Sequence, residues 1–213
     1  MFIQHVLKGI HAITDADADR AMTDTGILSN WWRRVGQISP AEKTTRLTED
    51  ELEWHLGRYD DFHPASGMRF GDNSPFISTT AGTVERDAWN QRNLLFPPLI
   101  TALRFATDDF AGDGHLFYAY VFVLGKKSVE LEGFAEETRD LHVYSGFQLY
   151  HPEGELAAKV SIPPQQVERW ERYHGPLVLD DLRAGQVPRP VFRSDNPHYQ
   201  RPERFHNLRP LMV

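Results

Sequence analysis

The alternation of apolar and polar positions along the chain predicts several strands. The strongest apolar stretch, "GHLFYAYVFVLG" at 114–125, is typical of a central strand buried on both faces. Shorter runs that are rich in β-branched and aromatic residues predict further strands. These runs lie at 4–13, 74–80, 155–162 and 167–175, with weaker candidates at 128–132 and 141–149.

The segment "TDADADRAMTDTG" at 14–26 combines a helix start with a helix stop. Thr14 can cap the helix, acidic residues fill its first turn, and Gly26 can end it. The "DADAD" run also resembles a calcium-binding loop, but Arg20 stands where such a loop needs glycine, and Gly26 stands where it needs a bidentate glutamate. We therefore interpret these acids as helix-start residues.

Two more helices are predicted in the first half of the chain. One covers 48–62, is capped by Thr48, and carries an apolar stripe made of Leu52, Leu56 and Tyr59. The other covers about 83–108 and is interrupted by the sequence "FPP". Because the helices come early and the strands late, we predict one α+β domain over 1–175. An irregular tail rich in proline and arginine is expected over 176–213.

The composition sets limits on partners and chemistry. With 213 residues, 40% apolar and 12% aromatic, the chain can bury a substantial core. A net charge of −7 argues against a nucleic-acid partner that is bound through phosphate contacts. The chain contains no cysteine, which excludes disulfides, thiolate catalysis and Cys-ligated metals. We expect no membrane span and no signal peptide, because no apolar run is long enough and the start lacks a charged segment.

Two acids lie one residue apart at the start of a predicted strand. Glu153 and Glu155 should point the same way, because side chains alternate along extended backbone. The same alternation places Ser78 and Thr80 on one face of "ISTT" and Thr79 on the other. A hydroxyl-bearing strand beside a two-acid strand suits glycosyl transfer, where one carboxylate stabilises an oxocarbenium-like sugar and the other accepts a proton. Each pattern alone is common, so a solvated loop rim is the alternative.

Three blocks in this order resemble a known enzyme family. They are "FISTT", "GDGHLFYAYVFVL" and "YHPEGELAAKVSIPPQQVERWERYHG". The chain from about residue 5 to 175 resembles the mono-ADP-ribosyltransferases of the cholera-toxin and pertussis-toxin A-subunit group, which have an Arg, Ser-Thr-Ser, Glu-x-Glu pattern. Ile162 follows Glu155 by the spacing of the corresponding residues in that family. The resemblance implies two packed, mainly antiparallel sheets around a cleft that binds NAD as co-substrate, with no metal.

The resemblance also implies roles for individual residues. Glu155 matches the catalytic glutamate, which stabilises the ribosyl cation as nicotinamide leaves. Glu153 matches the second acid, which prepares the acceptor in arginine-modifying members. Ser78 matches the serine that orients the catalytic glutamate, and Thr79 and Thr80 support the NAD cleft.

Further positions resemble the family less closely. His63, in "YDDFHPASG", resembles an active-site histidine that binds in the NAD cleft, although an ordinary solvated loop histidine is the alternative. Lys8 stands where the family has arginine, and it keeps the positive charge but loses the planar, bidentate fork. Three interpretations stay open: Lys8 binds NAD as a point charge, Arg33 or Arg34 of "WWRR" substitutes for the missing arginine, or the chain is inactive.

The implied activity is transfer of ADP-ribose from NAD to a protein side chain, with arginine as the expected acceptor. The stretch "HVYSGFQLY" falls at the acceptor-recognising turn, so Tyr144, Phe147 or Tyr150 are candidates to contact the target. Such a protein would be a toxin or effector that acts in the cytoplasm of a target cell. Its partners would be the target protein and a carrier subunit or immunity protein. An NAD glycohydrolase and a catalytically inactive binding module are the alternatives.

Overall fold

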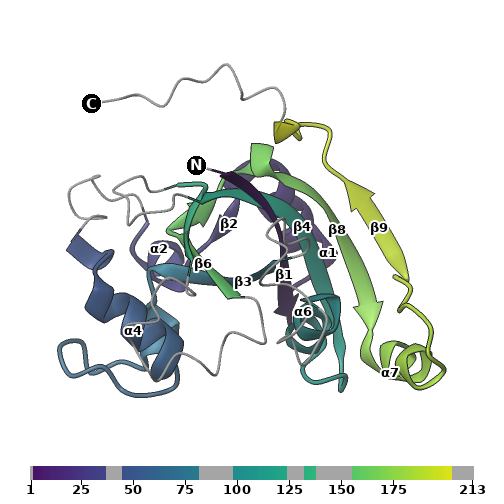
Figure 1. Cartoon of the computed structure of the whole chain (residues 1–213), viewed down its shortest axis with the longest axis horizontal. Coiled ribbons are helices and arrows are strands. Elements are labelled where there is room, and N and C mark those ends of the chain that lie inside the picture. Colours follow the sequence, from purple (N-terminus) through teal and green to yellow (C-terminus); the bar gives the residue numbers. More distant parts are fainter. Residues whose placement is uncertain (1, 37–44, 82–97, 124–131, 138–154, 203–213) are drawn as a thin grey trace.

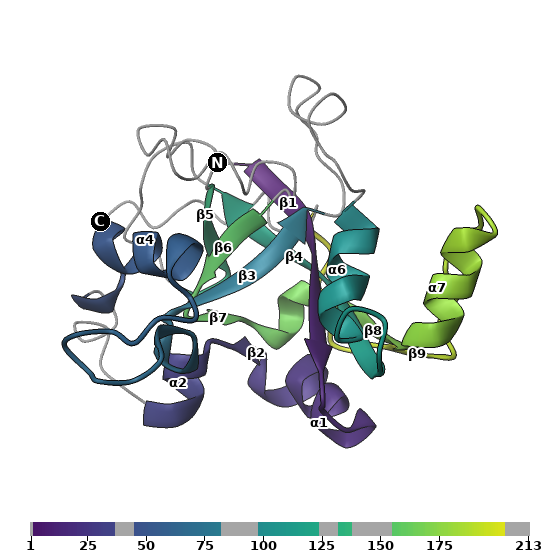
Figure 2. The same ribbon diagram turned by 90° about the horizontal axis from the view of Figure 1, so that it is seen from below.

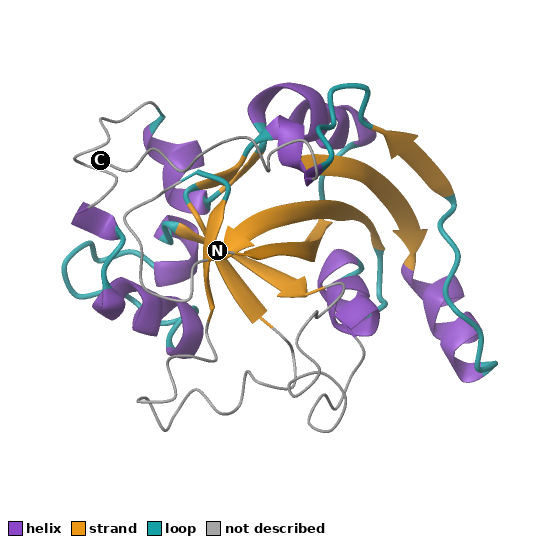
Figure 3. Ribbon diagram, turned by 45° about the horizontal axis from the view of Figure 1, so that its top comes forward, coloured by secondary structure: helices purple, strands orange, loops and turns teal. Residues whose placement is uncertain are grey.

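The computed structural model describes residues 2–36, 45–81, 98–123, 132–137 and 155–202. Its helical elements are α1 (Asp15–Arg20), the π-helix η1 (Ala21–Thr25), α2 (Asn30–Val35), α4 (Glu49–Gly57), the 3₁₀-helix η2 (Phe70–Asn73), α6 (Pro98–Ala106), the 3₁₀-helix η5 (Pro164–Gln166) and α7 (Gly175–Arg183). Its strands are β1 (Phe2–His11), β2 (Ile27–Leu28), β3 (Phe76–Ala81), β4 (Asp113–Val123), β5 (Phe134–Glu137), β6 (Glu155–Lys159), β7 (Ser161–Ile162), β8 (Val167–His174) and β9 (Phe192–Asp195). The predicted mixture of helices and strands is confirmed, and Figure 3 shows the helices around the curved strands.

The strands form one large sheet and one short pair. The large sheet has the order β1-β3-β6-β5-β4-β8-β9, and β2 pairs separately with β7. Every pairing is antiparallel except that of β4 with β5, so the mainly antiparallel character is as predicted. We had expected two packed sheets, and the described strands do not confirm that division. Strand β1 pairs with both β3 and β4, which closes five strands of the large sheet into a ring.

Strand β1 is joined to its two neighbours in the ring over very different lengths. Along β4, strand β1 is paired over its whole length, from Phe2 to His11. Along β3 it is paired only at Val6 with Ala81 and at Leu7 with Thr80. Beyond these two pairs β1 and β3 separate, and the next residue on β1 is Lys8. The sheet therefore opens where the sequence predicted the candidate site.

Helix α6 packs on the outer face of the ring. Its backbone lies so close to β1 and β4 that only glycine fits beneath it. A Cβ atom on Gly9 would lie 2.2 Å from the carbonyl oxygen of Ala102, and one on Gly114 would lie 1.5 Å from that of Ala106. In Figure 1, α6 lies on one side of the ring and α2 and α4 lie on the other.

The core explains why β4 is so apolar. Strand β4 has neighbours on both edges, β1 on one and β5 and β8 on the other, as predicted for a central strand. Its side chains contribute to two clusters of buried residues, one on each face. The interior cluster includes Val6, Ile77, Phe117, Leu156 and Trp170. The cluster beneath α6 includes Leu7, Ala102, Leu103, Leu116 and Tyr173.

The predicted helix starts are confirmed. Thr14 caps α1 through a reciprocal capping box with Asp17, and Thr48 caps α4 by accepting from the Glu51 backbone N–H. Gly26 follows η1 with φ +76°, a conformation that favours glycine. Helix α4 ends at Gly57 rather than at 62, and of the helix predicted at 83–108 the structure describes the part in α6.

The tail contains more regular structure than the sequence suggested. The expectation of an irregular tail is corrected by α7 and by β9, which pairs antiparallel with β8. The buried side-chain amide of Asn196 then donates to the carbonyl oxygens of Met22, Pro164 and Val167. These bonds anchor a polar segment that has little apolar periodicity of its own. Figure 2 shows α7 at the opposite end of the molecule from α4.

The weak strand candidate at 141–149 lies outside the described residues, as does nearly all of the one at 128–132. Among the described helices, none has the length and apolar character needed to cross a lipid bilayer.

Candidate active site

Glu155 and Ser78 lie on one face of neighbouring strands. Glu155 begins β6 and pairs directly with Thr80 of β3. Directly opposed residues in antiparallel strands point to the same face, and alternation adds Ser78 to that face. Glu155 is 8% exposed, so its carboxylate is held within the protein and is not part of a solvated rim. The shared face predicted for Ser78 and Thr80 therefore also carries the acid.

Thr79 occupies the opposite face of β3, as alternation predicts. Its hydroxyl donates to the carbonyl oxygen of Leu156 at 2.7 Å, and the residue is buried. This bond joins β3 to β6 beside Ile77 and Leu156 of the interior core. The structure therefore does not bring Thr79 together with the hydroxyl of Ser78 and the carboxylate of Glu155.

Helix α4 covers this face and places a histidine on it. Leu52 and Leu56 of α4 form a small buried cluster with Phe76 of β3 and Ala157 of β6. His55 lies on the same stripe, three residues after Leu52 and four before Tyr59. Burial of the two leucines thus directs the imidazole of His55 toward the strands, where it is itself buried.

His55 contacts both of the predicted catalytic groups. Its Nε2 atom lies 3.0 Å from Ser78 Oγ and 3.6 Å from Glu155 Oε1. Its Nδ1 atom lies 2.8 Å from the hydroxyl of Ser74, which is fully buried just before β3. One imidazole therefore links a serine and an acid that come from two different strands.

Sequence reasoning chose a different histidine. His63 lies in the loop after α4, where its ring packs edge-on against Trp54 at 4.8 Å and lies 5.7 Å from the ring of Phe70. The structure brings His55, and not His63, to Ser78 and Glu155. A signal was present in the sequence, because His55 belongs to the apolar stripe of a capped helix. A polar residue on such a stripe must find a buried partner.

Lys8 lies where β1 leaves β3, directly after the pair Leu7–Thr80. Burial lowers the pKa of Lys8 to about 8, the negative charge of Glu155 raises it in part, and the positive charge of Arg33 lowers it further. The charges of Glu155 and Arg33 therefore both act on the ammonium group of Lys8. A cation that interacts electrostatically with a buried carboxylate suits a ligand with a positive sugar and negative phosphates.

The two arginines of "WWRR" have different surroundings. Arg34 donates from Nε to Asn73 Oδ1 at 3.2 Å, so its guanidinium is engaged with η2. Arg33 donates to Asn30 on the surface of α2, and its charge also acts on Tyr59. Of the two candidates to supply the missing arginine, the structure brings only Arg33 electrostatically close to Lys8.

An aromatic ring borders the same site. Tyr59 is 40% exposed, and its ring lies 5.5 Å from that of His55 in an edge-on arrangement. The pKa of Tyr59 is raised mainly by burial, and to a smaller extent by the negative charges of Asp72 and Glu155. The ring lies directly on Gly71, where an added Cβ would come within 2.4 Å of it. Tyr59 was predicted only as an apolar stripe residue of the helix.

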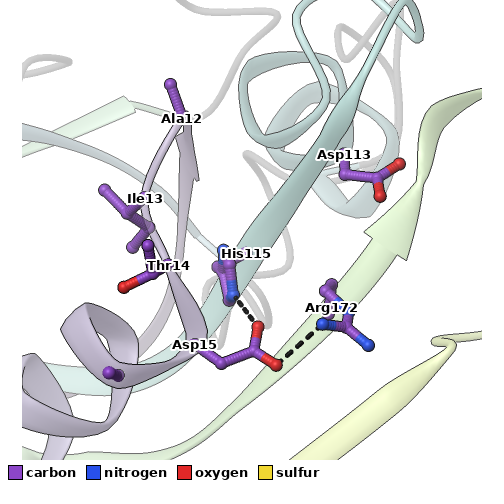
Figure 4. A pocket seen from close by; sticks show the side chains of 8 residues that line it. Ala12, Ile13, Thr14, Asp15, Asp113, His115 and Arg172 are labelled. Atoms are coloured by element: carbon purple, nitrogen blue, oxygen red, sulfur yellow. Dashed lines mark hydrogen bonds and ion pairs between the residues drawn. The ribbon is translucent and has the colours of Figure 1, made fainter.

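A separate hollow of about 600 Å³ lies where β1 ends and α1 begins, shown in Figure 4. Asp15 accepts there from Arg172 at 2.7 Å and lies 2.9 Å from His115 Nε2. The pKa of Asp15 is held below its usual value mainly by the hydrogen bond with His115 and less by the positive charge of Arg172. Of the other two acids of "DADAD", Asp17 accepts from the hydroxyl of Thr14 and Asp19 accepts from the indole N–H of Trp170. These contacts agree with their interpretation as structural acids at the helix start.

The remaining candidates fall outside the described residues. They are Glu153, Tyr144, Phe147 and Tyr150. Among the residues that the structure describes, no group of three or more acidic or histidine side chains is arranged to hold a metal ion.

Searches by sequence gave no match. No known family profile matches the chain, and no curated protein matches it.

Comparison with solved structures found distant likenesses. EcPltA is 14% identical over 93% of this chain and 88% of its own, with a TM-score of 0.48. A variant of the Scabin toxin from Streptomyces scabies is 11% identical over 92% and 76%, with a TM-score of 0.41. A mutant of E. coli heat-labile enterotoxin is 15% identical over 95% and 80%, with a TM-score of 0.44.

Proposed function

We propose that this protein is an NAD-dependent mono-ADP-ribosyltransferase that transfers ADP-ribose to a protein side chain. The observation that carries the proposal is the contact of one buried imidazole with both Ser78 and Glu155, and the charge of Glu155 also acts on Lys8. The resemblance of the strand blocks to the toxin family gives these same two residues, Ser78 and Glu155, their catalytic roles.

The chemistry follows from the charges. The bond between ribose and nicotinamide breaks, and its electron pair stays on the nicotinamide nitrogen. The sugar then carries a developing positive charge, which the fixed carboxylate of Glu155 stabilises. Such preorganised groups typically contribute about 10²–10³ in rate. The acceptor then attacks the sugar carbon, and Glu153, by resemblance, takes its proton.

Lys8 supplies charge for the rest of the ligand. NAD carries two phosphates, and an ammonium group can hold a phosphate as a point charge without bidentate geometry. Arg33 is a second cation whose charge acts on Lys8. This arrangement supports the first of the three interpretations of the lysine, in which it replaces the family's arginine, over an inactive chain.

The proposal also includes the acceptor residue and the cell compartment in which the protein acts. We take arginine as the acceptor residue and a target-cell protein as the partner, because of the Glu-x-Glu pattern. The protein would act as a toxin or effector in the cytoplasm of that cell, delivered with a carrier subunit or kept silent by an immunity protein. Water as acceptor would make it an NAD glycohydrolase instead.

Substitution of the acid tests the function directly. Glu155→Gln keeps the volume and removes the charge, so nicotinamide release should fall by about 10²-fold or more. Glu53→Gln is a matched control, because it makes the same change on an exposed position of α4. The assay measures nicotinamide release from NAD with and without a target-cell lysate. Equal rates for Glu155→Gln and the wild type would refute the proposal.

Labelled NAD separates transfer from hydrolysis. Label that becomes attached to a lysate protein, at an arginine mapped by mass spectrometry, supports transfer. Nicotinamide release that is independent of lysate and leaves no labelled protein supports the glycohydrolase. Glu153→Gln should reduce transfer more than hydrolysis, and equal mild losses from both acid substitutions would contradict this division of roles.

A further inference from the structure

Ser74 is a buried serine that touches His55 on the side away from the reaction. It is fully buried between η2 and β3, and its Oγ lies 2.8 Å from His55 Nδ1. The other imidazole nitrogen, Nε2, faces Ser78 and Glu155. Three side chains therefore form a chain of contacts, from Ser74 through His55 to Ser78.

The hydrogen bonds at Ser74 determine where its proton points. The backbone N–H of Phe76 donates to Ser74 Oγ at 3.1 Å and occupies one lone pair. The hydroxyl proton then has two acceptors within reach: the carbonyl oxygen of Phe76 at 3.4 Å and His55 Nδ1 at 2.8 Å. A distance of 2.8 Å is near the optimum for an O–H donor, whereas 3.4 Å is well beyond it. The hydroxyl therefore donates to His55 Nδ1.

A nitrogen that accepts a hydrogen bond cannot carry the proton of a neutral imidazole. The proton of His55 consequently lies on Nε2. The carboxylate of Glu155, 3.6 Å from Nε2, favours the same arrangement because it attracts an N–H. Nε2–H then donates to Ser78 Oγ at 3.0 Å. The hydroxyl proton of Ser78 is left to point toward the carboxylate or the substrate.

We propose that Ser74 is a positioning residue that fixes the Nε2–H tautomer of His55 and so keeps the hydroxyl of Ser78 as a donor in the cleft. This inference rests on the proposed function for its effect on rate, but its structural part stands on these contacts alone. With the tautomer reversed, Ser78 would donate to the imidazole instead, and the carboxylate or the ribose hydroxyl would lose that donor. Ser74 therefore acts on the reaction through two intermediate side chains without touching the substrate.

Nitrogen NMR of the whole protein tests the tautomer without any substrate. Long-range ¹H–¹⁵N correlation distinguishes protonated from unprotonated ring nitrogens, and His55→Asn assigns the signal by its disappearance. We expect the neutral wild-type imidazole to carry its proton on Nε2. In Ser74→Ala, where only the carboxylate of Glu155 still favours this form, a mixture of the two tautomers should appear. A wild-type imidazole protonated on Nδ1, or a Ser74→Ala variant that keeps the Nε2–H form alone, would overturn the inference.

Kinetics test the consequence for catalysis. Ser74→Ala should lower the kcat of nicotinamide release by about tenfold, the usual scale for one hydrogen bond, with the KM for NAD little changed. Ser74→Thr keeps the hydroxyl and should restore most of the rate. Ser66→Ala is a matched control, because Ser66 also accepts a backbone N–H but lies in an exposed loop. An altered tautomer with unchanged kcat would overturn the positioning role.

The NMR result separates the two possible failures. If the wild type releases no nicotinamide, the proposed function fails while the tautomer can still be measured. If the wild type is active and its His55 carries the Nδ1 proton, only the role of Ser74 fails. A wild-type spectrum with the proton on Nδ1 overturns the inference even if Ser74→Ala does not fold.

Discussion

Raising the pH from 7 to 9 should remove a positive charge from the candidate cleft. Burial lowers the pKa of Lys8 to about 8, and the attraction of Glu155 only partly offsets this effect. Lys8 is therefore charged at pH 7 and largely neutral at pH 9. If its ammonium group holds a phosphate of NAD, the affinity of the free enzyme for NAD must fall across this range.

The size of the effect follows from the fraction of charged lysine. With a pKa near 8, about one molecule in ten keeps the charge at pH 9, and the apparent affinity scales with that fraction. The kcat/KM for NAD should thus fall about tenfold between pH 7 and pH 9, because this ratio reports groups that titrate in the free enzyme. Lys8→Arg stays charged throughout, since guanidinium is not deprotonated in proteins.

The assay measures initial rates of nicotinamide release over a range of NAD concentrations at each pH. Wild type should show a fall in kcat/KM centred near pH 8, and Lys8→Arg should lack that fall. Lys8→Met should have a low kcat/KM at every pH, with no fall near pH 8. A wild-type profile that stays flat through pH 8, or an equal fall in Lys8→Arg, would refute the assigned role.

The pH dependence of wild-type stability is a control, because the contribution of Lys8 to stability should rise with pH while kcat/KM falls. The folded pKa of Lys8 lies below its ordinary value of 10.5, so between pH 8 and 10.5 the unfolded chain binds more protons than the folded one. The free energy of unfolding contributed by this group must therefore rise with pH across that window. If the activity fell because the protein unfolds, the free energy of unfolding would fall between pH 8 and 10.5 instead of rising.

Two further predictions concern stability. Asp15→Asn removes the charge that binds His115 and Arg172, and because the carboxylate is half-exposed the loss at pH 7 should be only about 1 kcal/mol. The pKa of Asp15 is lowered in the folded protein, so the stability that its charge contributes is lost as the pH falls through that pKa. Urea denaturation should therefore show the difference in unfolding free energy between wild type and Asp15→Asn vanishing at low pH. A constant difference down to pH 2 would contradict the reasoning. Gly114→Ala forces a Cβ into the backbone of Ala106 and should cost about 3 kcal/mol by calorimetry, whereas an unchanged Tm would show that α6 does not pack this closely.

The sequence by itself determined the features that depend on neighbouring residues. Thr14 and Thr48 cap helices because a hydroxyl reaches the backbone three residues ahead. Alternation on β3 placed Ser78 and Thr79 on opposite faces, because extended backbone repeats every two residues. The apolar run of β4 identified the central strand, since a strand covered on both faces of a sheet buries most of its side chains.

Only the tertiary structure decided which distant residues meet. His55 rather than His63 reaches Ser78, because burial of Leu52 and Leu56 sets the rotation of α4 against the sheet. The pairing of β1 with two strands, and of β9 with β8, depends likewise on packing that no local pattern records. Caps and alternation act over two to four residues. The site joins β1, α4, β3 and β6, so its assembly depends on how the whole core packs.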